Sequence, residues 1–193
     1  MLNKEQIKGI FKVGFTLCAI TAAAALVLAF VNSMTAPVIA KNTAEKQAIS
    51  MQKVLPEAKE FSDENLINDN MDKMVTAVYE GKDESGNNCG YAVMVSPKGY
   101  GGDVSMAVGV DADLKVSGLD IVSQSETAGL GAKCVNEDFR NQFIGKSSGI
   151  TVSKSGAKDN EIDAITSATI TSKAVTLGVN TALEAVAQIE EDK

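Results

Sequence analysis

The sequence predicts an α+β protein: a single N-terminal transmembrane helix, followed by one domain with a mostly antiparallel sheet and flanking helices. Three patterns lead to this prediction. Residues 13–31 form an uncharged apolar run, residues 75–122 contain strands with alternating apolar side chains, and residues 172–190 repeat apolar side chains at helical spacing. The first pattern is typical of a membrane span, and the other two indicate a sheet and a helix.

The membrane span is predicted from length and composition. No charged residue occurs between Val13 and Ala40, and residues 13–31 are nearly continuous Ala, Leu, Val, Ile and Phe. At about 1.5 Å per residue, such a run roughly matches a hydrocarbon core of about 30 Å. We expect a transmembrane helix over residues 13–34, after a short N-terminal segment at residues 1–12. A cleaved signal peptide is the alternative, but its apolar run is usually shorter and a small-x-small site usually follows it.

The charges that precede this helix predict its orientation. Lys4, Lys8 and Lys12 lie before the apolar run, and only Glu5 opposes them. Basic residues tend to stay on the cytoplasmic side of a membrane. The N-terminus is therefore expected in the cytoplasm, and the domain that follows the helix is expected to be extracytoplasmic.

Residues 35–74 are expected to form a juxtamembrane helix and a loop. Residues 41–55 lack Gly and Pro and place apolar side chains three or four positions apart, at Ala44, Ala48, Met51 and Leu55. This spacing predicts a helix that ends at Pro56. Residues 57–74 are polar and acidic, which predicts a loop with little core.

The domain is expected to occupy residues 75–193 and to begin with a meander of strands. Residues 75–79 and 91–95 read as strands, and the Gly, Asp, Ser and Asn residues between them favour a hairpin turn. Two further apolar series, at residues 104–110 and 116–122, extend the sheet.

Two helices are expected to follow the sheet. Phe139 and Phe143 are four residues apart, which predicts a short helix that ends at Gly145. The apolar series from about Ser172 to Glu190 predicts a longer amphipathic helix.

Composition excludes several classes of function. The chain has a net charge of -7 and no cluster of basic residues, so nucleic-acid binding is not expected. It contains no His, which removes the usual general base and the commonest metal ligand. Cys18, Cys89 and Cys134 lie far apart without a C-x-x-C motif, so no metal site is expected within this chain. Redox chemistry would require an organic cofactor. Cys89 and Cys134 could pair outside the cytoplasm, but their spacing in sequence does not give their distance.

The segment before the last predicted helix has the composition of a phosphate site. Residues 163–172, DAITSATITS, are rich in small and hydroxyl-bearing side chains. Small side chains let a bulky ligand approach the backbone, and the N-terminus of a helix favours a phosphate. The same residue types are also expected in a plain helix cap, which is the alternative interpretation.

A second segment has the composition of a ligand-binding turn. In residues 126–133, ETAGLGAK, Gly129 and Gly131 flank Leu130, and Lys133 follows. The glycines would let backbone amides meet a flat ring or a phosphate, and Leu130 would cover a ring face. The pattern is not G-x-G-x-x-G, so a dinucleotide site is not indicated.

Together the two segments resemble the FMN-binding domain shared by the G subunit of the Rnf complex and the C subunit of the sodium-pumping NADH:quinone reductase. The flavinylation motif of that family is S/T-G-A-T-x-T, and residues 166–171 occupy its positions, with Ser167 in place of the usual Gly. The resemblance implies that a separate flavin transferase joins FMN covalently to Thr171 through a phosphodiester. It also implies that Asp163 takes part in recognition by the transferase, and that Ala168 and Thr169 contact the cofactor.

The resemblance covers most of the chain. Residues 99–111 and 139–146 also match the family, in the same order, whereas Ala128 stands where many relatives have Pro. The family pattern implies that the second segment lines the flavin through Glu126, Thr127, Gly129, Leu130, Gly131 and Lys133.

The length of the chain resembles that of the shorter Rnf G subunit. That complex couples electron transfer between reduced ferredoxin and NAD+ to sodium or proton movement across the membrane. The resemblance implies an electron-relay subunit of this redox-driven translocase, with no independent catalytic activity, that works with the complex's other membrane and peripheral subunits. Two alternatives stay open: the C subunit of the sodium-translocating NADH:quinone reductase, and a flavin-free extracytoplasmic scaffold or binding domain.

Overall fold

The computed structural model describes residues 4–68 and 70–192. The chain divides into two compact units, Met1–Glu45 and Lys46–Lys193. The second unit begins before the domain boundary expected at residue 75, because the end of the long N-terminal helix packs with the sheet. Of the N-terminal segment expected at residues 1–12, residues 1–3 lie outside the described part of the chain.

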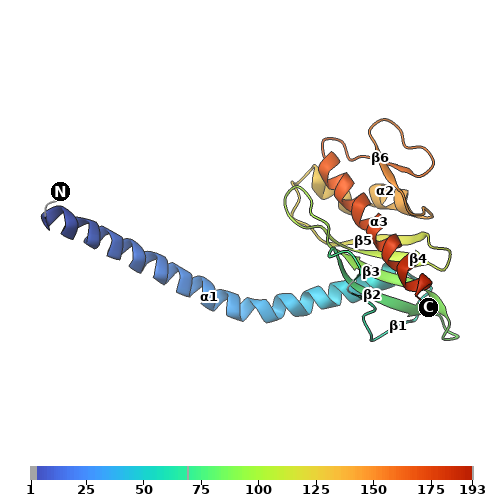
Figure 1. The fold of residues 1–193 in the computed structure, drawn as a ribbon, viewed down its shortest axis with the longest axis horizontal. Coiled ribbons are helices and arrows are strands. Elements are labelled where there is room, and N and C mark those ends of the chain that lie inside the picture. The colour runs from blue at the N-terminus through green and yellow to red at the C-terminus, as the bar shows by residue number, and fades with distance from the viewer. Residues whose placement is uncertain (1–3, 69, 193) are drawn as a thin grey trace. The chain divides into compact units, whose positions relative to one another are not determined.

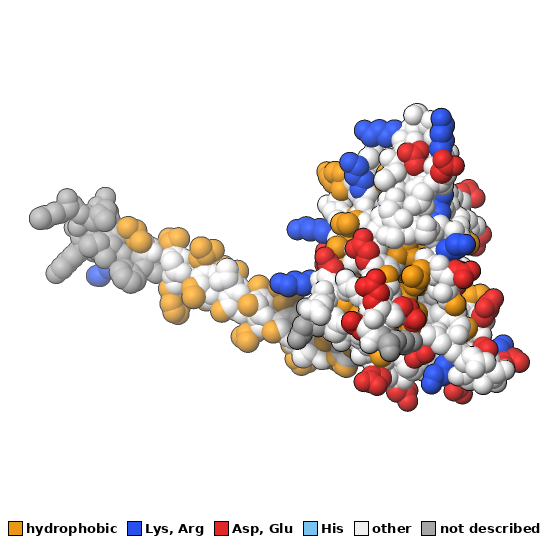
Figure 2. Space-filling model, turned by 45° about the vertical axis from the view of Figure 1, so that its right-hand side comes forward, with side chains coloured by type: hydrophobic (Ala, Val, Ile, Leu, Met, Phe, Trp, Pro, Cys, Tyr) orange, Lys and Arg blue, Asp and Glu red, His pale blue; other side chains and the backbone are white. Residues whose placement is uncertain are grey.

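Helix α1 runs without interruption over Lys4–Val54. The sequence predicted two helices, but residues 35–40 continue the helical geometry although Pro37 lies inside it. A proline removes one backbone N–H and disturbs only one turn of a helix. The turns before and after Pro37 keep their hydrogen bonds, so the helix continues through it. The helix is long and apolar enough to cross a membrane, and its most apolar 18-residue stretch has a mean hydropathy of 2.3. Figure 2 shows apolar side chains along this helix, while charged side chains are spread over the second unit.

The second unit contains a five-stranded antiparallel sheet (Figure 1). Its order follows the sequence, from β1 to β5, which confirms the predicted meander. The strands are β1 (Glu60–Phe61), β2 (Val75–Lys82), β3 (Asn88–Val95), β4 (Ser105–Asp111) and β5 (Val116–Ser123).

Both faces of the sheet are covered, and alternate residues of a strand serve different cores. On β3, Tyr91, Val93 and Val95 belong to the main core, which helix α3 (Thr169–Glu191) completes. Ala92 and Met94 point to the other face and pack with the last turns of α1. The alternation in the sequence therefore separates two apolar environments rather than a core from solvent.

Two glycines let the end of α1 lie directly on the sheet. A Cβ at Gly109 or Gly118 would overlap the backbone of Val54. Nearby, the Ser117 hydroxyl donates a hydrogen bond to the Val54 carbonyl oxygen at 2.7 Å. This contact satisfies a carbonyl at the C-terminal end of the helix, where no intrahelical partner is available.

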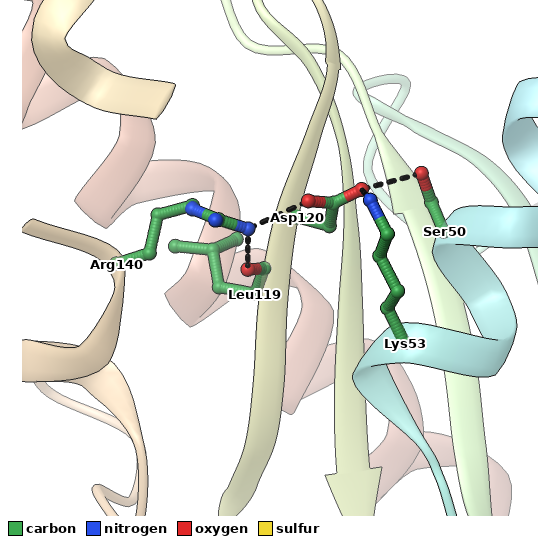
Figure 3. A network of polar contacts seen from close by, with 5 residues as sticks. All are labelled: Ser50, Lys53, Leu119, Asp120 and Arg140. Atoms are coloured by element: carbon green, nitrogen blue, oxygen red, sulfur yellow. Dashed lines mark hydrogen bonds and ion pairs between the residues drawn. The ribbon is translucent and has the colours of Figure 1, made fainter. Parts of the chain in front are cut away.

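A polar network also joins the end of α1 to the sheet (Figure 3). Asp120 on β5 is buried and accepts hydrogen bonds from Ser50 at 2.7 Å and from Arg140 at 2.6 Å. Lys53 lies 3.5 Å from the same carboxylate, and Arg140 also donates to the Leu119 carbonyl oxygen at 3.1 Å. Because a buried charge needs partners, this network fixes the last turns of α1 and the α2 segment to one point of the sheet.

Short elements support the site described below. They are the 3-10 helices η1 (Gly131–Val135) and η2 (Asn141–Phe143), helix α2 (Glu137–Arg140), and a parallel pair of strands, β6 (Thr151–Ser153) and β7 (Glu161–Asp163). The predicted short helix corresponds to α2 and η2. The rings of Phe139 and Phe143 pack edge to face, with their centroids 5.5 Å apart. The predicted loop at residues 57–74 contains β1 and buries Ala58 and Met71.

Candidate functional site

The two segments singled out in the sequence meet at the N-terminal end of α3. They line a cavity of about 590 Å³. Its walls come from the Gly-rich loop at residues 99–102, from the turn that leads into η1, and from the start of α3. The lining residues are Tyr100, Glu126, Thr127, Leu130, Gly131, Ser167, Ala168, Thr169, Ile170 and Thr171. Residues separated by 45 positions in the sequence are in contact there.

Thr171 lies in the first turn of α3. The helix begins at Thr169, earlier than the start expected near Ser172. The side chain of Thr171 lines the cavity, yet the residue is only 1% exposed. Its hydroxyl donates a hydrogen bond of 2.5 Å to Oε2 of Glu126. This length is at the short end of the range for a hydroxyl that donates to a carboxylate.

Glu126 is held in place through its other carboxylate oxygen. Oε1 accepts the backbone N–H groups of Tyr100 and Gly101, both at 2.9 Å. Only 8% of the residue is exposed. Its own backbone N–H donates to Oε1 of Gln124. The carboxylate therefore has a fixed orientation, with one oxygen on the Gly-rich loop and the other on Thr171.

Gly131 leaves room for this carboxylate–hydroxyl pair. A Cβ at this position would lie 2.5 Å from Oε2 of Glu126 and 2.6 Å from Oγ1 of Thr171. Both distances are well inside ordinary carbon–oxygen contact. A glycine is required here by the closeness of its neighbours.

The start of α3 contradicts the plain-cap interpretation of the hydroxyl-rich segment. The cap position is held by Ala168, and no side chain makes a capping hydrogen bond there. Ser172 instead ties the preceding loop to the helix: its hydroxyl accepts the Ile165 N–H at 2.9 Å and donates to the Ala168 carbonyl oxygen at 3.0 Å. The backbone N–H groups of the first turn thus lack a side-chain acceptor at the cap, as suits the end of a helix that receives an anion.

Ser167, at the position where the family motif usually has Gly, adopts a backbone conformation that favours glycine. Its φ is +62°, in the left-handed region. A residue with a Cβ costs roughly 1–2 kcal/mol in this region. The turn before α3 therefore holds Ser167 in a strained conformation.

The rim of the cavity is apolar and open. Tyr100, Leu130 and Ile170 line it and are 71%, 41% and 56% exposed, respectively. A large exposed aromatic or aliphatic side chain at a cavity is typical of a surface that receives a flat ligand. An apolar rim, a helix N-terminus and a buried hydroxyl together fit the ring, the phosphate and the attachment point of FMN.

Three residues implied by the family pattern lie off this cavity. Gly129 is exposed in the adjoining turn, with a φ of +78°. Lys133 and Asp163 line a second, shallower cavity of about 260 Å³, together with Thr166. The Asp163 carboxylate accepts the backbone N–H groups of Gly156 and Ala157 at 3.1 and 2.9 Å, so it organises the loop between β6 and β7.

Sequence reasoning missed two residues of the main cavity, Tyr100 and Ile170. Tyr100 lies in the GYGG segment, residues 99–102, which matches the family but was not predicted to bind a ligand. Ile170 occupies the variable position of the family motif, and its exposure next to the cavity is visible only in the fold.

Cys134 lies beneath the site. Burial raises the pKa of its thiol to about 11, and the negative charge of Glu126 adds to this effect. Cys134 and Cys89 are both free thiols, so the pairing left open by the sequence is not formed. Among the residues that the structure describes, no group of His, Cys, Asp and Glu could hold a metal ion.

Family models match most of the chain. The model of the RnfG N-terminal region matches residues 1–54, and the model of the FMN-binding domain matches residues 99–184. The G subunit of the Na(+)-translocating ferredoxin:NAD(+) oxidoreductase complex of Acetobacterium woodii is 37% identical, over 95% of this chain and 97% of that protein. The chain belongs to the RnfG family. The G subunit of the proton-translocating complex of Clostridium ljungdahlii is 35% identical, over 95% of both chains.

Solved structures share the fold of this RnfG-family chain. The C subunit of the Na(+)-translocating NADH-quinone reductase from Parabacteroides distasonis has a TM-score of 0.58 and 22% identity, over 77% of this chain and 92% of that one. NqrC from Shewanella oneidensis has a TM-score of 0.50 and 18% identity, over 70% of this chain and 74% of that one. These likenesses show that this chain has the fold of the two C subunits, while the full-length similarity in sequence is to G subunits.

Proposed function

We propose that this RnfG-family chain is a membrane-anchored electron-relay subunit of an ion-translocating ferredoxin:NAD+ oxidoreductase complex, and that it carries FMN on Thr171 through a phosphodiester. The observation that carries the proposal is the position of the Thr171 hydroxyl. It lies at an apolar-rimmed cavity, at the N-terminus of a helix, and is oriented by the buried Glu126.

Each part of the site suits one part of the cofactor. The Thr171 oxygen would form the covalent link, and the first turn of α3 would face the phosphate, where its N–H groups and dipole favour negative charge. Leu130, Ile170 and Tyr100 would contact the flavin ring. When bound, FMN supplies the ability to accept and release electrons, which the side chains of this protein lack.

Once FMN is attached, the side chains of the site would hold the cofactor in place and would not act on the electron donor or acceptor. The chain contains no His, and Glu126 contacts the Gly-rich loop and Thr171. A relay needs only a cofactor at a fixed place, and a covalent bond to a packed helix provides that. We therefore expect no independent catalytic activity from the isolated subunit.

The proposal includes a place for the protein in the membrane. Helix α1 would anchor the chain through residues 13–34, with the basic N-terminal segment in the cytoplasm and the FMN-binding domain outside it. Partners would be the other subunits of the complex and, during maturation, a flavin transferase. Asp163, exposed at the end of β7 beside the site, is proposed to be part of the surface that the transferase recognises.

The proposal is tested by the chemistry of one residue. The full chain is produced with a flavin transferase and denatured, and the peptide that contains residue 171 is examined for flavin fluorescence and for the mass of an FMN phosphodiester. Thr171→Ala should abolish attachment, and Thr171→Ser, which retains a hydroxyl, should restore part of it. Flavin that stays bound to denatured Thr171→Ala protein would refute the proposed attachment site.

The same preparation decides between the alternatives. A wild-type chain that never acquires flavin would leave the scaffold function as the explanation. Purification from the native host identifies the complex, because subunits of a ferredoxin:NAD+ oxidoreductase should accompany the protein. Recovery with subunits of an NADH:quinone reductase would instead identify it with the C-subunit function.

A further inference from the structure

The pairing of Glu126 with Thr171 points to a role beyond holding the Gly-rich loop. We propose that Glu126 is a catalytic residue for the attachment of FMN to its own chain: it takes the proton of the Thr171 hydroxyl as that oxygen attacks phosphorus, and it keeps the proton afterwards. This inference rests on the proposed attachment of FMN at Thr171.

The geometry is that of a nucleophile beside its base. A neutral threonine hydroxyl is a weak nucleophile, and enzymes activate such groups with an adjacent proton acceptor. Oγ1 of Thr171 is 2.5 Å from Oε2 of Glu126, and both residues line the same cavity. The proton already points at the carboxylate before any flavin donor arrives. A transferase that docks over the cavity would meet a hydroxyl that is oriented for loss of its proton.

The two carboxylate oxygens of Glu126 have different partners, and this difference identifies Oε2 as the oxygen that would accept the proton of Thr171. Oε1 receives two backbone N–H groups, from Tyr100 and Gly101. Within the described residues, the hydroxyl of Thr171 is the one hydrogen-bond donor to Oε2. Oε2 is therefore free to accept a full proton while Oε1 keeps the carboxylate in place.

The reaction balances without an oxidant or reductant. The donor must be a flavin nucleotide whose phosphate is activated by an anhydride, as in FAD. The bond between Oγ1 and phosphorus forms, and the anhydride P–O bond breaks. Its electron pair leaves with the nucleoside monophosphate, and the proton of Oγ1 moves to Oε2 of Glu126.

The attachment of FMN also explains why the proton would stay on Glu126. Once esterified, Oγ1 can no longer donate a hydrogen bond to Oε2. A charged Glu126 would then face an anionic phosphodiester in a site where it is almost fully buried, and like charges so placed repel strongly. A protonated Glu126 would avoid this repulsion, and its Oε2 could then donate a hydrogen bond where it now accepts one.

The test compares the full-length wild-type chain with Glu126→Gln, using purified flavin transferase and FAD. Glutamine keeps an oxygen for the two backbone amides but is a poor proton acceptor, so the attachment rate should fall about 100-fold, the scale of general base catalysis. The rate is read as flavin fluorescence that survives denaturation. Unchanged thermal unfolding would show that the loop still forms.

A count of released protons separates catalysis from a purely structural role. Near pH 8 the nucleotide product is fully ionised, so each attachment frees about one proton, unless the protein retains it. A pH-indicator dye should therefore report close to no release for wild type and about one proton per FMN for Glu126→Gln. Equal proton release by the two proteins, or attachment rates within about twofold of each other, would overturn the proposal.

Two further outcomes are kept distinct. If Glu126→Gln does not fold, Glu126→Asp replaces it: the shorter carboxylate should slow attachment about tenfold while the proton is still retained. Release of the proton by a folded, flavinylated Glu126→Asp chain would refute the role of the carboxylate. A wild-type chain that acquires no flavin on Thr171 refutes the proposed function itself, whereas equal behaviour of wild type and variant refutes the role of Glu126 alone.

Discussion

Gly131→Ala is expected to uncouple Glu126 from Thr171 without changing either residue. Gly131 is buried, and its backbone does not adopt the left-handed conformation, so alanine is acceptable to the main chain. The added methyl group, however, would lie 2.5 Å from Oε2 of Glu126 and 2.6 Å from Oγ1 of Thr171. Ordinary carbon–oxygen contacts begin at about 3.3 Å, so each oxygen must retreat by up to about 0.8 Å. A hydrogen bond of 2.5 Å cannot survive both movements.

The loss of stability in Gly131→Ala has two contributions. Loss of a buried hydrogen bond to a charged group costs about 1.5–3 kcal/mol, and overpacking adds about 1–3 kcal/mol. Because the two contributions overlap, we expect a loss of about 3 kcal/mol in the free energy of unfolding. We also expect attachment of FMN to slow about 100-fold, since Oγ1 would no longer face its proton acceptor.

Urea denaturation of the flavin-free chain measures the first effect, and flavin fluorescence after denaturation measures the second. Gly102→Ala is the matched control: it lies in the neighbouring loop, and its Cβ would meet Ser125 at an ordinary 3.5 Å. The control should change stability by less than about 1 kcal/mol. A Gly131→Ala chain with wild-type stability and a wild-type rate of attachment would refute the importance of this contact.

Three further predictions concern single positions. Ser167→Gly should raise the free energy of unfolding by about 0.5–1 kcal/mol in urea, because relief of left-handed strain exceeds the added entropy of the unfolded chain. Arg140→Met should lower it by about 3 kcal/mol, since Asp120 would lose its closest charged partner, and an unchanged urea midpoint would contradict this. Native Cys134, with its pKa of about 11, should resist iodoacetamide at pH 9 and react only after unfolding, as peptide masses would show. Because its folded pKa lies above the ordinary 9.0, the stability due to this thiol is complete below pH 9 and is lost as the pH rises toward 11.

The sheet was predictable because its residues alternate, but the meaning of the alternation was not. Val93 and Met94 are neighbours on β3, and each is buried in a different core. The second core exists because the end of α1 packs on the sheet. Nothing in the sequence of the strands indicates this contact. The shortest strands, β1, β6 and β7, have two or three residues each, too few for any periodic pattern.

The candidate site was predictable in its parts and not in its contacts. Glycines near Leu130 and hydroxyl groups near Thr171 pointed to two ligand-binding segments. The hydrogen bond from Thr171 to Glu126 spans 45 residues, so only the fold can place the two side chains together. The same limit explains why Lys133 was grouped with the cavity: it follows Gly131 by two positions, but η1 turns it toward the second cavity.

The site buries Thr171, the proposed point of attachment, and exposes its rim, and this division suits the proposed relay. Thr171 is 1% exposed and belongs to a helix that completes the main core, whereas Tyr100 and Ile170 are more than half exposed. An enzyme must enclose its substrate to exclude water and to align proton donors. A carrier of electrons needs neither condition: its cofactor must be held at one place and yet be approachable by two partners in turn. The proposed attachment at the buried Thr171, beside an open apolar rim, would meet both needs.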